Sequence, residues 1–151
     1  MIKSVAGASG GMRQLDDQAY RTLADFRYLL RRFLAFSENA ARGAGLTPRQ
    51  HQALLAIKGF AGDAAPTIGD LAARLSIRPH SAVELAGRLA EAGLVTRIAD
   101  PHDRRRVLLR LTETAEARLA ALSLAHIDEL AAIRPALLEI LRLVGAPSAP
   151  D

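Results

Sequence analysis

Apolar side chains recur at helical spacing through the first third of the chain. Between about Met12 and Ala41, an apolar or small residue recurs after every three or four positions, which is the period of a heptad repeat. The members of this seam are Ala19, Leu23, Phe26, Leu30, Phe33 and Ser37. Leu29, Leu34 and Phe36 widen the apolar surface beyond a single stripe. The pattern predicts a long helix that is covered either by a helix of a second copy or by the core of a monomeric bundle.

A strong helix start follows this first helix. Thr47 is a good N-cap residue, Pro48 fits the first helical position, and Gln50 completes a capping box. We therefore expect a second helix that continues to about Lys58. The small and turn-forming residues 59–66 then predict a loop.

Two shorter helices are predicted in the middle of the chain. Thr67 is expected to cap the first of them, with Asp70 three residues on as the second member of a capping box. Residues 76–78 predict a tight turn, Pro79 then begins the next helix, and Gly93 ends it. The residues expected on the inward face of that helix are Ala82, Leu85, Ala86 and Leu89. Two helices joined by such a turn are typical of a helix-turn-helix.

Two strands are predicted next, over residues 94–99 and 106–111, with a charged turn at residues 100–105 between them. Apolar positions alternate along the second strand with a period of two. The alternation predicts that Leu109 faces the core and that Leu108 faces solvent.

A last long helix is expected after the strands, with Thr112 as its cap and with Pro135 restarting or kinking it. The order of elements predicts a mainly α fold with a small β-wing, which is a winged helix-turn-helix. At 151 residues the chain is expected to form a single domain. The expected segments are a disordered lead at 1–11, dimerisation helices at 12–45 and 113–144, the winged helix-turn-helix lobe at 46–112, and a frayed tail at 145–151.

The positive charge of the chain is concentrated in its middle. The formal net charge is +4, and residues 74–110 alone carry eight arginines against four acidic side chains. A basic patch on one element is typical of a nucleic-acid binder, although a solvated arginine-rich face would have the same composition.

The composition argues against several other classes of protein. The absence of cysteine excludes disulfides and thiolate metal sites, and it is compatible with the cytoplasm, where we expect the protein. No apolar run approaches the roughly 18–20 residues of a membrane span. The sequence has no Gly-rich phosphate loop and no cluster of catalytic carboxylates with a histidine, so we expect neither an enzyme nor a bound cofactor.

The outer face of the predicted second helix of the helix-turn-helix, and the charged turn after it, supply candidate DNA contacts. Glu84 has the chemistry to accept from cytosine N4, and Arg88 to reach guanine or a phosphate. The candidates for the recognition helix are Arg78, Pro79, His80, Ser81, Glu84 and Arg88. Those for the wing are Arg97, Asp100, Asp103, Arg104, Arg105 and Arg106. The two aspartates are expected to orient the arginines, which would enter the minor groove.

The central segment resembles the DNA-binding domain of the bacterial MarR family of transcriptional regulators. The family's wing pattern D-x-R-x-x-x-V-x-L-T is matched through Asp103, Arg105, Leu109, Leu111 and Thr112, with leucine at the valine position. The stretches GLTPRQHQALLAI and LAEAGLVTR resemble its second helix and the junction of recognition helix and wing, and a looser likeness extends over residues 12–144. Two departures are Arg78, where the family usually has a Ser or Thr cap, and Glu84, where a basic or polar residue is common.

The resemblance implies a homodimer with intertwined terminal helices and a pocket for a small aromatic or phenolic effector. The candidates to line that pocket are Tyr28, Phe33, His51 and His126. Each of these residues has an ordinary core or interface role as its alternative. The predicted function is a ligand-responsive repressor that binds double-stranded DNA at a pseudo-palindromic operator.

Three other interpretations of the central segment remain open. The helix-turn-helix would serve protein contact alone in one of them, although three adjacent arginines are unnecessary for that task. In another, His51, His80, His102 and His126 would gather as a metal sensor, but their spacing has no i, i+4 pair and favours no metal. The third is an architectural protein that binds DNA of any sequence.

Overall fold

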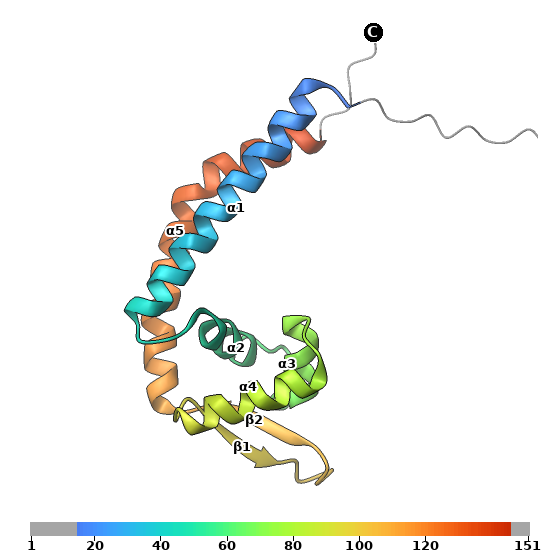
Figure 1. The fold of residues 1–151 in the computed structure, drawn as a ribbon, viewed down its shortest axis with the longest axis vertical. Coiled ribbons are helices and arrows are strands. Elements are labelled where there is room, and N and C mark those ends of the chain that lie inside the picture. The colour runs from blue at the N-terminus through green and yellow to red at the C-terminus, as the bar shows by residue number, and fades with distance from the viewer. Residues whose placement is uncertain (1–14, 146–151) are drawn as a thin grey trace, which may run out of the picture. The chain divides into compact units, whose positions relative to one another are not determined.

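The computed structural model describes residues 15–145, so the expected disordered lead at 1–11 and the tail after Gly145 lie outside the described residues. Figure 1 shows a mainly helical chain with one small antiparallel sheet, which confirms the predicted fold class. The elements are α1 (Asp17–Gly43), α2 (Pro48–Lys58), α3 (Ile68–Leu75), α4 (Pro79–Glu91), β1 (Val95–Ala99), β2 (Val107–Leu111) and α5 (Glu113–Gly145).

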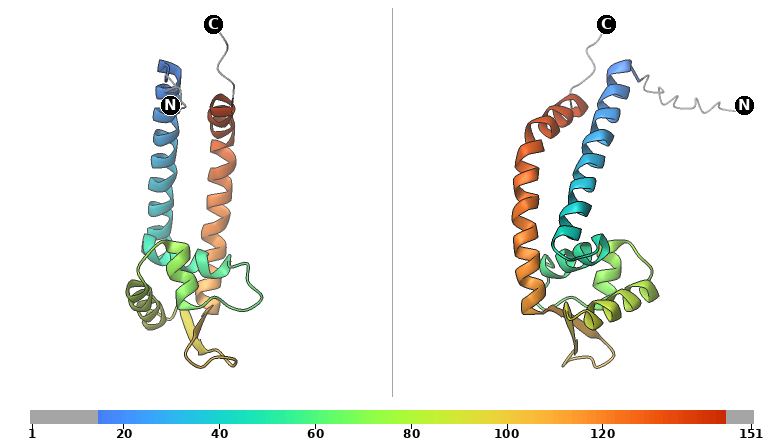
Figure 2. Two further views of the ribbon diagram at one scale, coloured as in Figure 1. Left: turned by 90° about the vertical axis from the view of Figure 1, so that its right-hand side faces the viewer. Right: turned by 60° about the vertical axis from the view of Figure 1, so that its left-hand side comes forward.

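Internal contacts divide the chain into two units. The first contains the described part of Met1–Arg31 together with that of Ile133–Asp151, and the second is Arg32–Ala132. The second unit holds the helix-turn-helix and the hairpin, and the two views of Figure 2 show these elements gathered together. No helix within residues 15–145 has the length and apolar character needed to cross a membrane.

Four leucines from four different elements form the centre of the second unit. Leu54 of α2, Leu71 of α3, Leu89 of α4 and Leu109 of β2 are its largest fully buried side chains. Burying each leucine contributes roughly 1.5–3 kcal/mol, so this contact fixes α4 and the hairpin on one core. The inward face predicted for α4 is confirmed, since Ala82, Leu85, Ala86 and Leu89 are all buried.

Local hydrogen bonds begin α2 and α3 as the sequence predicts. Thr47 and Gln50 form a complete capping box, and so do Thr67 and Asp70. In the second box, the backbone N–H and the hydroxyl of Thr67 both donate to Asp70 Oδ2, each at 2.8 Å. Arg78 stands at the N-cap of α4 without a side-chain cap bond, as expected for an arginine there.

The hairpin pairs β1 with β2 in antiparallel register, so that Arg97 lies opposite Leu109 and Ile98 opposite Leu108. The prediction that Leu108 faces solvent is wrong, because only 7% of this residue is exposed. The chain at Pro66 and Thr67 runs along the free edge of β2. Leu109 N–H donates to the Pro66 carbonyl at 2.8 Å, and Thr67 forms a bridge with Leu108. Residues on both faces of β2 are therefore buried.

The last helix is continuous from Glu113 to Gly145. Thr112 accepts a bond from Ala115 N–H at 3.2 Å and donates to the Gly93 carbonyl at 2.7 Å, which confirms it as the cap. Pro135 lies inside the helix and does not restart it. A proline there lacks the N–H that would bond the carbonyl of Ala131, a loss that neighbouring turns of the helix tolerate.

Large apolar side chains remain exposed on both long helices. The seam predicted for α1 is open in the single chain, where Leu23, Phe26 and Leu30 are exposed. The exposed large apolar residues of α5 are Leu124, Ile127, Leu130, Leu138, Leu141 and Val144. Large apolar surface left in water on two helices is typical of an interface.

Candidate nucleic-acid interface

The outer face of α4 carries the side chains expected of a recognition helix. His80, Glu84 and Arg88 are exposed, and Ser81 is half-buried beside them. Arg78 and Pro79 are exposed at the start of the helix. These groups offer hydrogen-bond donors and acceptors of the kind that read base edges in a major groove.

Val83 is also exposed on this helix, at the flank of that face, and was missed by the sequence reasoning. It is 53% exposed, although valine side chains are usually buried. Its position between Ser81 and Glu84 on a helix would have indicated this exposure. A methyl-bearing side chain at this place has the chemistry to contact a thymine methyl group.

The tip of the hairpin holds an arginine in a carboxylate fork. Arg105 Nε donates to Asp103 Oδ1 at 3.2 Å, and Arg105 Nη2 lies 3.4 Å from Asp103 Oδ2. These bonds, together with one from the Arg105 backbone, lower the pKa of the Asp103 carboxyl. The Arg105 side chain is nevertheless 91% exposed, so Asp103 orients its guanidinium without covering it.

Asp100 is buried and stabilises the hairpin turn through both its side chain and its backbone N–H. Its Oδ1 accepts the backbone N–H of His102 at 2.9 Å, and its Oδ2 lies 3.8 Å from Arg106 Nη1. The Asp100 backbone N–H donates to the Arg106 carbonyl at 3.0 Å. The structure thus brings each aspartate of the turn to a different arginine, as the sequence suggested.

Arg97 lies beside the recognition helix rather than at the tip. It occupies the middle of β1, opposite the buried Leu109. A Cβ added at Gly87 of α4 would meet Arg97 Nη1 at 4.0 Å. That distance is an ordinary van der Waals separation, so the Arg97 guanidinium lies close to α4 at this glycine.

Three of the four residues proposed for an effector pocket gather in the second unit. The His126 ring lies 4.8 Å from the His51 ring and 5.9 Å from the Phe33 ring, measured between centroids. Phe36 and Ser37 complete the group, since the Phe36 ring lies 5.4 Å from that of His126 and Ser37 Oγ lies 2.7 Å from His126 Nε2. Sequence reasoning assigned these two only to the apolar surface of the first helix.

The remaining pocket candidate is placed differently. Tyr28 belongs to the other unit and is exposed. Among the gathered residues, His51 is buried, and burial followed by the nearby charge of His126 lowers its pKa below the ordinary value of 6.5. Within residues 15–145 no three His, Cys, Asp or Glu side chains converge as metal ligands.

A groove elsewhere on the second unit has a volume of about 540 Å³. It lies between the end of α2, the following loop and α3. The residues that line it are Ala56, Gly59, Phe60, Ala61, Gly62, Asp70, Ala73 and Arg74. None of the candidate effector residues contributes to it.

A short helix pair, an exposed polar face on its second helix and a charged antiparallel hairpin define a winged helix-turn-helix. Comparison with known proteins narrows this class. Residues 44–106 match the sequence model of the MarR family. This match covers less than half of the chain, and it agrees with the resemblance that the sequence of the central segment shows.

A curated protein is similar to part of this chain. An uncharacterised HTH-type transcriptional regulator, YcgE of Bacillus subtilis (strain 168), is 36% identical over 85 residues, which are 56% of this chain. The matched region spans about half of that relative, 53% of its length.

Solved structures share the fold. MarR family transcription regulator SP03579 superposes with a TM-score of 0.69 at 24% identity, covering 85% of this chain and 87% of that one. A mutant of S. aureus MepR bound to an oligodeoxyribonucleotide gives 0.60 at 20% identity, with 85% of each chain covered. CouR from Rhodococcus jostii RHA1 bound to p-coumaroyl-CoA gives 0.59 at 21% identity, covering 90% and 96%.

Proposed function

We propose that this chain is a sequence-specific, DNA-binding transcriptional regulator that acts as a homodimer. The observation that carries the proposal is the joint placement of α4 and the hairpin on one leucine core. The core presents His80, Glu84 and Arg88 beside an arginine-bearing tip. A polar helix face suits the major groove, and exposed arginines suit the adjacent minor groove. The MepR mutant, which shares this fold, is bound to an oligodeoxyribonucleotide in its solved structure.

The exposed apolar residues of α1 and α5 support a dimer of this chain. A second copy would cover Leu23, Phe26 and Leu30 of α1 together with the apolar face of α5. In such a dimer the two recognition helices would enter successive major grooves roughly 34 Å apart, and the operator would be a pseudo-palindrome.

The group formed by Phe33, His51 and His126 supports a response to a small aromatic or phenolic effector. The rings present aromatic edges to a ligand, and one fold relative, CouR, is bound to p-coumaroyl-CoA. Release from DNA on effector binding would make the protein a repressor. Thermal-shift screening with small aromatic acids tests this part, since an effector should raise the midpoint of unfolding and weaken DNA binding. No such shift from any compound, with DNA binding unaffected, would count against it.

A sequence-indifferent architectural protein is the second candidate, because the exposed wing arginines would bind any duplex. Selection of bound fragments from a genomic pool separates the two functions. A specific regulator should enrich a common site and bind it at least ~10³-fold more tightly than random DNA. If random competitor DNA displaced the protein from the selected site as well as that site's own sequence does, the architectural function would replace the regulator.

Paired variants divide the site into readout and affinity. Arg105→Ala should weaken binding to all DNA and reduce the slope of log affinity against log salt by about 1. Glu84→Ala should instead change the preference among sites and leave that slope unchanged. Binding titrations over a series of salt concentrations, with the selected site and a scrambled one, measure both. If both variants changed affinity alike on both DNAs, the assignment of Glu84 to base readout would be wrong.

A further inference from the structure

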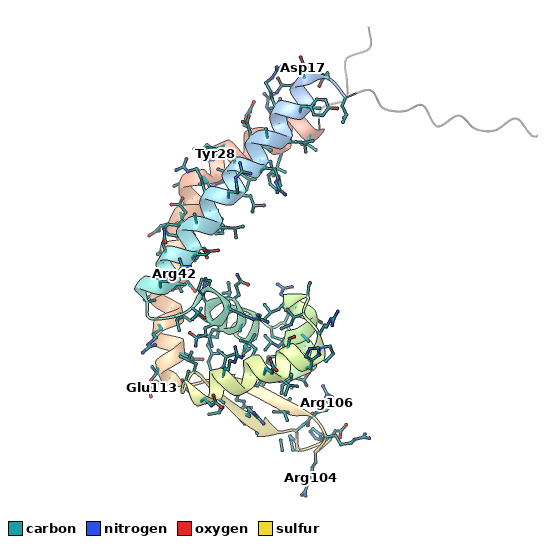
Figure 3. The ribbon with its side chains drawn as sticks, viewed as in Figure 1. Asp17, Tyr28, Arg42, Arg104, Arg106 and Glu113 are labelled. Atoms are coloured by element: carbon teal, nitrogen blue, oxygen red, sulfur yellow. The ribbon has the colours of Figure 1, made fainter. Side chains whose placement is uncertain are left out.

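The three consecutive arginines of the hairpin differ in what surrounds them. Arg104 has no bonded partner among residues 15–145, and Figure 3 shows it extending away from the end of the hairpin. Arg105 is paired with Asp103 but almost fully exposed. The Arg106 side chain is less exposed, at 56%, and it lies near a second carboxylate. The three guanidinium groups therefore differ in exposure and in their partners.

Arg106 lies near a carboxylate that is itself buried. Arg106 Nη1 is 3.8 Å from Asp100 Oδ2, and only 8% of Asp100 is exposed. A carboxylate taken out of water needs hydrogen bonds and a positive neighbour to offset its lost hydration. The backbone N–H of His102 supplies a hydrogen bond to the other oxygen, and Arg106 supplies the positive charge.

The backbone of Arg106 is fixed on both sides. Its N–H donates to the Asp103 carbonyl at 2.9 Å, and its carbonyl accepts from Asp100 N–H at 3.0 Å. These two bonds hold the Cα at the base of the tip. The position of the Arg106 Cα is therefore fixed, and the negative charge of Asp100 orients the guanidinium.

The base of the hairpin also meets the start of α3. The hydrogen bonds from Thr67 lower the pKa of Asp70 most, and the positive charge of Arg106 lowers it further. Asp70 caps the start of α3, and Thr67 forms the bridge to Leu108 of β2. Arg106 thus lies where the hairpin meets the first helix of the helix-turn-helix.

We propose that Arg106 is a positioning residue, which holds the wing tip at a fixed angle by joining Asp100 to the start of α3. Arg104 and Arg105 are then left as the cations that contact DNA. This inference rests on the proposed DNA binding, and it revises the expectation that all three arginines enter the groove. A positioning residue contributes to affinity without displacing counterions from the phosphates.

The salt dependence of DNA binding separates the two tasks. Arg106→Gln should weaken binding to the selected operator roughly three- to tenfold, while the slope of log affinity against log salt stays as in the wild type. The matched control, Arg105→Gln, should reduce that slope by about 0.9. Arg106→Lys keeps the charge and should recover most of the lost affinity. A reduced slope for Arg106→Gln, or unchanged affinity, would overturn the proposal.

A double-mutant cycle tests whether the effect passes through Asp100. If Arg106 acts through this carboxylate, Arg106→Gln combined with Asp100→Asn should weaken binding little more than the stronger single variant. Additive losses would mean that the two residues act independently, against the proposal.

Amide hydrogen exchange without DNA tests positioning separately from the proposed function. The backbone N–H groups of Asp100 and Leu109 should exchange faster in Arg106→Gln than in the wild type, and at the wild-type rate in Arg105→Gln. Unchanged exchange in Arg106→Gln would overturn the proposal. If the wild-type protein preferred no DNA sequence, the proposed regulatory function would be wrong. The exchange measurement would still decide whether Arg106 positions the wing tip.

Discussion

Leu108 offers a direct test of how the wing is attached. The residue lies on the face of β2 opposite to Leu109, which strand alternation assigns to solvent. In the structure only 7% of it is exposed, because the chain at Pro66 and Thr67 runs alongside. The loss of stability in Leu108→Ala therefore shows whether this face of β2 is buried or exposed to solvent.

The expected loss follows from the atoms removed. Leu108→Ala deletes three carbon atoms, each worth about 0.8 kcal/mol of transfer free energy, which gives about 2.4 kcal/mol. Any cavity left behind adds to this transfer term, so we expect a total loss of about 2.5 kcal/mol, toward the lower end for a buried leucine. Leu109→Ala, in the closed core, should lose about 3 kcal/mol or more.

Urea unfolding followed by circular dichroism measures these losses, with all variants at one protein concentration because dimerisation would contribute to stability. Arg110→Ala is the matched control, since Arg110 is exposed on the same strand and points to the same side as Leu108. It should change stability by less than about 0.5 kcal/mol. If Leu108→Ala behaved like Arg110→Ala, the attachment of β2 to residues 66 and 67 would be refuted.

Three further outcomes are expected. Thr67→Ala removes two bonds of the α3 capping box and should cost about 1 kcal/mol in the same unfolding assay, whereas an unchanged stability would mean that the box contributes nothing. His51 has a lowered pKa, so its unfolded form takes up a proton more readily than the folded form. Stability should be full above about pH 6.5 and fall as the pH drops toward the lowered pKa. His51→Gln should flatten this loss in unfolding curves recorded from mildly alkaline to mildly acidic pH, and equal pH dependence in both proteins would contradict the assignment. Sedimentation equilibrium should show a dimer at micromolar concentration, and a stable folded monomer would contradict the proposed interface.

The parts of the fold that depend on neighbours in sequence were predictable. Both capping boxes, the turn before Pro79 and the inward face of α4 follow from residue types three or four positions apart. The pairing of Asp103 with Arg105 is equally local, since the two residues are two positions apart in the chain. Such contacts form whenever the element forms, so local sequence is enough to predict them.

The parts that local sequence patterns misjudged or left open depend on residues far apart in the chain. Leu108 is covered by residues that come much earlier in the sequence, and no periodicity within a strand reports such a neighbour. His51 and His126 come from different helices, so their contact needed the packing of α1, α2 and α5. Arg97 was grouped with the other arginines of the wing, and its position beside Gly87 of α4 depends on how the helix packs against the hairpin.

The hydrogen bonds of His126 fix the orientation of its ring. Its Nδ1 lies 2.7 Å from the Leu122 carbonyl, which only accepts, so Nδ1 is the nitrogen that carries the hydrogen. Ser37 Oγ lies 2.7 Å from Nε2, so the hydroxyl of α1 donates to the other nitrogen of the neutral ring. Both nitrogens of one side chain of α5 are therefore engaged, and the ring cannot turn about its bond to Cβ without breaking a contact between two helices.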